Sequence, residues 1–180
     1  MRSISGVVIG LVVDVNDPES EGRVKLSFPW MSEGEPQSNW ARIAAPMSGP
    51  ERGFFFLPEI DDEVLVAFEQ GDLRLPYVIG FLWNGEQKPP HSEPTRRTIH
   101  TVSGHRLEFE DKAGSEKISL LFKGAKPSIT LQEEVIEIVL NDTSSIKLES
   151  GTLTIQFDGT TSIVLSAGGV KVSGAKIELN

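Results

Sequence analysis

The second half of this 180-residue chain repeats one short pattern nine times, in which an apolar residue, a polar residue and another apolar residue follow one another. The nine apolar pairs recur roughly every 7 to 10 residues: Leu107/Phe109, Ile118/Leu120, Ile129/Leu131, Ile138/Leu140, Ile146/Leu148, Leu153/Ile155, Ile163/Leu165, Val170/Val172 and Ile177/Leu179. Gly, Asn or Asp occupies many of the joints between pairs. This pattern predicts a series of short strands, each with one apolar side and each followed by a tight turn.

Each predicted strand offers only two or three inward apolar residues, which are too few for one chain to enclose a core. We therefore expect residues 101–180 to form a triple-stranded, intertwined β-helix, a needle in which nearly every strand edge pairs with another chain. At about 4.7 Å between strands, nine strands on each face give a rod roughly 40 Å long. A single-chain β-solenoid is the alternative, although such solenoids usually need coils of about 18 residues. The residues expected at the needle axis are Leu107, Phe109, Ile118, Leu120, Ile146, Leu148, Ile155, Ile163, Leu165, Val170, Val172, Ile177 and Leu179.

The first half of the chain differs in composition, because it contains all three tryptophans and ten of the eleven prolines. It predicts five short strands separated by turn residues, over 4–15, 22–28, 40–45, 63–68 and 75–82. No segment has a helical period over ten or more residues. Five strands in so short a segment favour a small barrel of the OB type over residues 1–85, and the proline-rich residues 86–100 are expected to be a linker. The fold class is thus all-β throughout.

Composition excludes several classes of function. The formal net charge is −9, the wrong sign for neutralising the phosphates of a nucleic acid. Cysteine is absent, so neither disulfides nor thiolate chemistry can occur. The sequence contains no run of about 18 apolar residues, so no membrane span is predicted. Hydrophobic residues make up only 38% of the chain, a low share that suits a core made jointly by several copies.

The candidate chemical groups do not indicate an enzyme, and we expect no catalytic, cofactor or metal site. His91, His100 and His105 are the only histidines, and we expect His105 to be a structural turn residue. The acidic run Asp61-Asp62-Glu63 precedes a predicted strand, where solvated carboxylates are ordinary. The sequence has neither a nucleophile elbow nor a phosphate-binding glycine pattern before a helix.

Three consecutive aromatic residues, Phe54, Phe55 and Phe56, form a dense apolar run. If they belong to a strand, successive side chains point to opposite faces, so at least one must leave the barrel interior. We expect this run to contact another subunit or a hub protein, with simple core filling as the alternative.

Several stretches, taken together in order, resemble the central spikes of contractile injection systems, a family that includes phage baseplate assembly protein V and the VgrG proteins. They are Gly6–Gly10 through Asp17-Pro18 to Gly22–Leu26, then Trp40–Met47, Arg52–Phe68, Gly71-Asp72 with Pro76–Gly85, and Ser103–Asp111. Each stretch alone is weakly diagnostic, but the ordered set spans most of the chain and is specific.

The resemblance implies a homotrimeric OB collar below a needle, which leads the tail tube through the target cell envelope when the sheath contracts. It implies a hub protein at the OB end and a small PAAR-like cap at the needle tip, Glu178, Leu179 and Asn180. It also implies assembly in the cytoplasm into a virion or injection particle. Since the first predicted strand begins near Ile4, the hub is expected to be either a separate protein or a segment that this sequence does not include, and there is no room for an inserted lysozyme domain. The alternative is a saccharide- or receptor-binding tail module.

Overall fold

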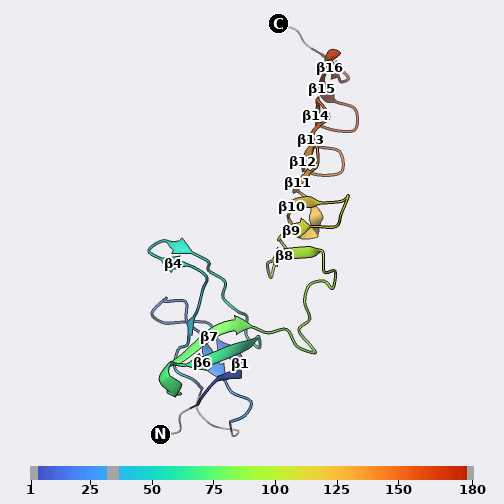
Figure 1. Cartoon of the computed structure of the whole chain (residues 1–180). Coiled ribbons are helices and arrows are strands. Elements are labelled where there is room, and N and C mark those ends of the chain that lie inside the picture. The colour runs from blue at the N-terminus through green and yellow to red at the C-terminus, as the bar shows by residue number, and fades with distance from the viewer. Residues whose placement is uncertain (1–3, 32–36, 178–180) are drawn as a thin grey trace. The chain divides into compact units, whose positions relative to one another are not determined.

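The computed structural model describes residues 4–31 and 37–177, which form strands, loops and two short 3-10 turns at Glu69–Gly71 and Lys123–Ala125. The chain divides into two compact units, Met1–Pro89 and Pro90–Asn180 (Figure 1). Among the described residues there is no helix of the length and apolar character needed to cross a membrane. The all-β prediction is therefore confirmed.

The first unit contains a five-stranded sheet in the order β2-β1-β6-β7-β3. Its strands are β1 (Val7–Asp14), β2 (Lys25–Ser27), β3 (Arg42–Ile43), β6 (Glu63–Phe68) and β7 (Pro76–Phe81). The pairs are antiparallel except for β3 and β7, which run parallel. A further bridge between Val24 and Ala41 joins the chain just before β2 to the chain just before β3, so the two ends of the sheet are linked.

Alternation along these strands places the core of the first unit. On β6 the side chains of Val64, Val66 and Phe68 are buried, whereas those between them are only partly buried. The same period of two buries Val12 on β1 and Leu26 on β2. The complete buried apolar set is Val12, Val24, Leu26, Phe28, Ala41, Val64, Val66, Phe68 and Val78.

The five predicted strands of this unit are confirmed, but a small hairpin was not predicted. Strands β4 (Ser48–Gly49) and β5 (Arg52–Gly53) pair where the sequence indicated only a turn. Gly53 has φ +145°, and a Cβ there would lie 2.6 Å from the carbonyl oxygen of Met47. Only glycine fits such a close approach, so Gly53 fixes the hairpin.

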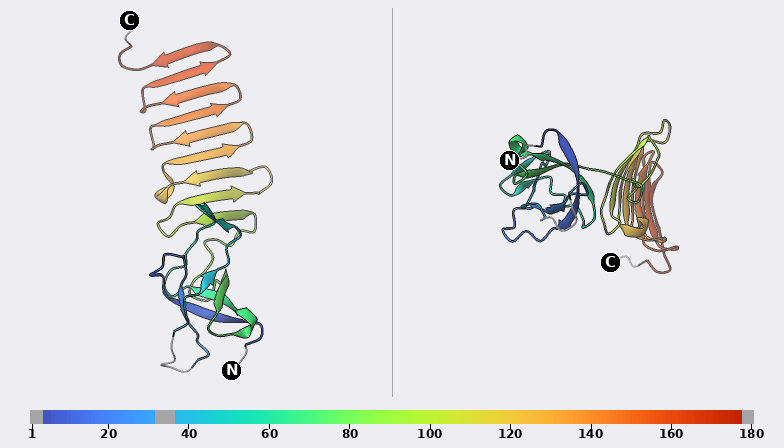
Figure 2. Two further views of the ribbon diagram at one scale, coloured as in Figure 1. Left: turned by 90° about the vertical axis from the view of Figure 1, so that its left-hand side faces the viewer. Right: turned by 90° about the horizontal axis from the view of Figure 1, so that it is seen from below.

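The second unit is a nine-stranded sheet whose strands follow chain order, each antiparallel to the next (Figure 2). The strands are β8 (Arg96–His100), β9 (Arg106–Glu110), β10 (Lys117–Leu121), β11 (Ser128–Gln132), β12 (Val135–Val139), β13 (Ser145–Glu149), β14 (Thr152–Gln156), β15 (Ser162–Ser166) and β16 (Gly169–Ser173). Every ladder partner comes from the same chain, which differs from the expectation that strand edges pair with other chains. The intertwined trimeric β-helix thus remains a prediction.

Part of this unit follows a 17-residue period. Residues 128–144, 145–161 and 162–178 each begin with Ser-Ile-x-Leu. The first two of these segments contain two five-residue strands, a two-residue turn and a five-residue loop. The 7-to-10-residue spacing in the sequence is this longer period divided into its two strands.

Candidate interaction surfaces

One face of the nine-stranded sheet carries two continuous rows of apolar side chains, which we term the apolar face. Register brings the row members opposite one another on successive strands, as in Ile129↔Ile138 and Ile138↔Ile146. One row consists of Ile99, Leu107, Leu120, Ile129, Ile138, Ile146, Ile155, Ile163 and Val172. The other consists of Phe109, Ile118, Leu131, Ile136, Leu148, Leu153, Leu165 and Val170.

These rows are not covered by any other part of the chain that the structure describes. Ile138 is 42% exposed and Leu148 is 46% exposed, whereas the core residues of the first unit are at most 8% exposed. Among the described residues of the second unit, no apolar side chain counts as buried. A contiguous apolar surface of this extent marks an interaction site.

Most of the residues predicted at the needle axis lie together on the apolar face. The structure places Leu107, Phe109, Ile118, Leu120, Ile146, Leu148, Ile155, Ile163, Leu165, Val170 and Val172 in the two rows. Ile177 follows β16 outside any strand, because the 17-residue period puts a loop there, so it belongs to neither row. Leu179 and the other two predicted tip residues, Glu178 and Asn180, lie outside the described residues.

The opposite face of the sheet, the polar face, has a different chemistry. Its central row is Thr98, Glu108, Ser119, Thr130, Glu137, Lys147, Thr154, Val164 and Lys171. Ion pairs run along its strands, with Arg106 Nε 2.8 Å from Glu108 Oε1 and Lys147 Nζ 2.5 Å from Glu149 Oε2. One face thus suits water and the other suits an apolar partner.

The two edges of the sheet also differ. The long-loop edge carries the connections 101–105, 122–127, 140–144 and 157–161. In each, the amide of the first residue donates to the carbonyl of the last, at 2.9 to 3.0 Å. The short-turn edge carries 111–116 and then the two-residue turns 133–134, 150–151 and 167–168. The two edges of the sheet are therefore chemically and geometrically distinct, with long loops on one and mostly two-residue turns on the other.

In the first unit, Phe54, Phe55 and Phe56 lie in an extended connection between β5 and β6 rather than in a strand. Strict alternation therefore does not apply to them, because the Gly53 hairpin ends the local ladder, but the expectation that at least one of them leaves the barrel interior is confirmed. All three side chains are exposed, Phe55 by 75%. The rings of Phe54 and Phe56 are stacked with centroids 6.5 Å apart.

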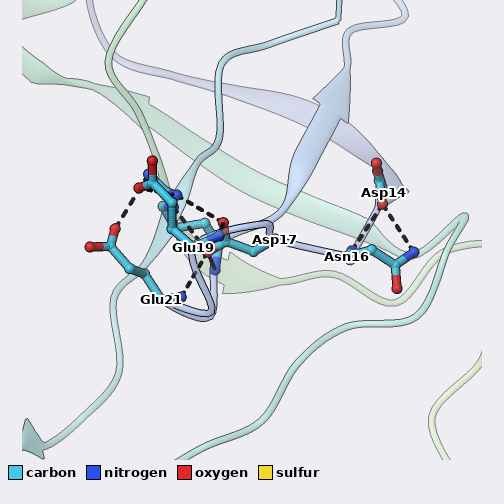
Figure 3. A network of polar contacts seen from close by, with 6 residues as sticks. Asp14, Asn16, Asp17, Glu19 and Glu21 are labelled. Carbon is cyan, nitrogen blue, oxygen red and sulfur yellow. Dashed lines mark hydrogen bonds and ion pairs between the residues drawn. The ribbon is translucent and has the colours of Figure 1, made fainter.

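The loop between β1 and β2 is organised around Asp17, whose side chain is only 4% exposed (Figure 3). Its carboxylate accepts hydrogen bonds from the backbone amides of Glu19 at 3.1 Å and Glu21 at 2.9 Å. Arg23 donates to it from Nε at 3.0 Å and from Nη2 at 2.8 Å. These bonds from Arg23, with the backbone donors, hold the pKa of Asp17 well below its ordinary value.

Two of the titratable residues considered in the sequence, His105 and Asp62, have local structural contacts. The His105 ring lies 4.5 Å from the Phe122 ring, and its Nδ1 accepts a 3.3 Å hydrogen bond from the amide of Lys123. Asp62 accepts a 2.8 Å bond from the amide of Glu59 in the turn before β6. No three His, Asp or Glu residues in the described part of the chain are grouped so that they could hold a metal ion.

Sequence reasoning missed the Asp17–Arg23 contacts and the difference between the sheet edges. The sequence did contain a signal for the first, because Arg23 follows the turn residue Asp17 by six positions. The second could have been found by aligning the three 17-residue segments.

Comparison with known proteins agrees with this geometry. Residues 8–83 match the family described as the type VI secretion system/phage-baseplate injector OB domain. The match covers nearly all of the first unit, which therefore has the sequence of an OB domain of this family.

The wider matches identify the family. The chain is 30% identical, over 97% of its length, to the actin cross-linking toxin VgrG1 of Vibrio cholerae. It is 33% identical over 65% of its length to the type VI secretion system spike protein VgrG3 of V. cholerae, and 32% identical over 63% to the spike protein VgrG5 of Pseudomonas aeruginosa. These matches place the chain in the VgrG-like family of baseplate and spike proteins. The chain spans 13% to 18% of the length of these curated relatives.

Proposed function

We propose that this chain is the structural, non-enzymatic centre of an injection spike and that it works as a homotrimer. The observation that carries the proposal is the apolar face of the second unit, whose two rows find no cover within the described chain. Three copies that turn these rows toward a common axis bury them and leave the polar faces in water. The second unit, with its sheet starting at β8 (Arg96–His100) inside the predicted linker, then becomes the needle that was expected over residues 101–180, and the OB domain, residues 1–85, becomes the collar.

The mechanical role follows from this arrangement. A rod whose core is shared by three chains resists bending and unfolding, because no chain can leave without exposing all three apolar faces. Such a rod suits the leading tip of a tail tube that is driven through a cell envelope when a sheath contracts. The similarity of this chain to relatives named as spike proteins supports this mechanical role.

The proposed partners occupy the two ends of the chain. A separate hub protein is proposed to bind the OB collar, with the exposed Phe54, Phe55 and Phe56 as a contact to the hub or to a neighbouring subunit. A PAAR-like cap is proposed at the tip, Glu178 to Asn180. Assembly in the cytoplasm into an injection particle or virion completes the proposal.

Light scattering after size exclusion tests the central claim. We expect a mass of about 59 kDa, three times the 19.7 kDa chain. A folded species of 19.7 kDa at every concentration would refute the trimer.

A further inference from the structure

We propose that the three sheets of the needle join through unlike edges, with the Phe122–Lys123 loop of one copy seated in a hollow on the short-turn edge of the next. This inference rests on the trimer proposed above and adds which residues meet and in which direction the ring runs.

The inserted group is the start of the β10–β11 loop, on the long-loop edge. Phe122 opens the loop between β10 and β11, and its side chain is 44% exposed. The His105 ring packs against it, and His105 Nδ1 accepts the amide of Lys123, so the loop is held in place. Lys123 is exposed and forms no ion pair with a described residue. Lys126, in the same loop, is already paired with Asp142.

The receiving hollow lies on the opposite edge and has a volume of about 340 Å³. Its apolar floor is made by Phe109, Ile118 and Leu131 from one row of the apolar face. Acidic side chains from the adjoining turns stand around it, together with one lysine: Asp111, Glu116, Glu133 and Lys117. Asp111 is paired with Arg97, whereas Glu116 and Glu133 form no ion pair with a described residue.

The projection and the hollow lie at the same level of the strand ladder. The Phe122 loop joins β10 to β11, and the hollow is lined by residues at the ends of β9, β10 and β11. A threefold axis along the ladder relates copies by rotation without translation, so equal levels meet. Neighbouring strands are about 4.8 Å apart, a difference in level that a lysine side chain can span.

Rotation about the threefold axis brings the long-loop edge of each copy to the short-turn edge of the next, and the charges agree with this contact. Contact between two long-loop edges would bring Lys123 against Lys123, and contact between two short-turn edges would bring Glu133 against Glu133. Only unlike edges place a cation beside carboxylates and an aromatic ring over an apolar floor. Such a heterologous contact repeats head to tail and closes into a ring.

Cross-linking can test this arrangement cleanly, because the chain has no cysteine of its own. In the full chain, we expect Lys123→Cys combined with Glu133→Cys to give covalent trimers on a denaturing gel after treatment with a short bis-maleimide. Lys123→Cys alone should stay monomeric. Lys123→Cys with Ala167→Cys is the matched control, because Ala167 lies on the same edge as Glu133 but two repeats along, and it should also stay monomeric.

A charge exchange gives a second, independent readout. Lys123→Glu should lower the trimer fraction at a fixed concentration, and adding Glu133→Lys should restore it. A trimer by light scattering that neither cross-links between positions 123 and 133 nor responds to the exchange would overturn the edge contact but leave the trimer intact. Monomers in the unmodified chain would overturn the trimer and the edge contact together.

Discussion

Asp17 sets the shape of the loop between the first two barrel strands almost alone. Its carboxylate accepts hydrogen bonds from the backbone amides of Glu19 and Glu21, which follow it in the loop, and from the guanidinium of Arg23. Arg23 also reaches Glu19 at 2.7 Å and Glu21 at 3.3 Å, so one cation faces three carboxylates. Removing Asp17's charge therefore leaves several donors without their shared acceptor.

We predict that Asp17→Asn lowers the melting temperature of the first unit at neutral pH, since an amide has one carbonyl acceptor and cannot form the charged pair. The folded-state pKa of Asp17 is lowered below the ordinary value of 3.8, so its contribution to stability is present above about pH 4 and is lost as the pH falls. The melting difference between the two proteins should thus shrink in acid. Asp14→Asn, which does not touch Arg23, is the control. An equal difference at neutral and low pH would contradict the assignment.

The Arg74–Asp72 pair adds to the same acid sensitivity. Hydrogen bonds from the Arg74 side chain lower the pKa of Asp72 to about 2. Both carboxylates favour the folded state more strongly above pH 4 than below it. The pair is exposed on the arginine side, so its share is small.

Leu26 is fully buried in the core of the first unit, and Leu26→Ala is expected to destabilise this unit by about 2–5 kcal/mol. Ile60→Ala, at a position 53% exposed, should change stability by less than about 1 kcal/mol. Urea unfolding followed by tryptophan fluorescence measures both, because Trp30, Trp40 and Trp83 all lie in the first unit. Equal losses for both variants would mean that the barrel core has been misplaced.

At the scale of elements, alternation was enough to find the strands but not their neighbours. Val64, Val66 and Phe68 identify β6 and its inner face directly from sequence. In the second unit, however, Ile129 can pair equally well with an isoleucine of its own chain or of another copy. The pattern fixes which side of a strand is apolar, and only turn length and backbone geometry fix which strand comes next.

The failures at candidate site residues have physical causes of the same kind. Ile177 fits the apolar alternation but falls at a loop position of the 17-residue period. Phe54 to Phe56 resemble a strand, yet the positive φ of Gly53 and its approach to Met47 turn the chain into a hairpin just before them. Single residues with unusual backbone geometry override local preference, and sequence periodicity does not reveal them.

A neighbouring pair of substitutions on β14 separates the two faces of the sheet. Ile155→Asp places a charge in the middle of an apolar row, between Ile146 and Ile163, and is expected to abolish trimers. Thr154→Asp places the same charge on the polar face beside Lys147 and should leave the trimer intact. Sedimentation at several protein concentrations gives the comparison. Loss of trimers in both variants, or in neither, would argue against burial of the apolar face.

For the whole molecule, the two units draw stability from different sources. The first contains its own core, whereas the described second unit has no buried apolar side chain. We therefore expect two thermal transitions. The transition of the first unit, read by tryptophan fluorescence, should be independent of protein concentration, while that of the second, read by far-ultraviolet circular dichroism, should rise with concentration. A second transition that does not move on dilution would show that the sheet is stable as a single chain.

The 17-residue period makes the length of the proposed needle a discrete quantity. Two strands at about 4.8 Å each give a step of roughly 10 Å per repeat. Because each repeat contains an even number of strands, the chain leaves it in the direction in which it entered and with the same side chains on the apolar face. Gain or loss of whole repeats would therefore change the length of the proposed needle in fixed steps, without altering its cross-section or its two ends.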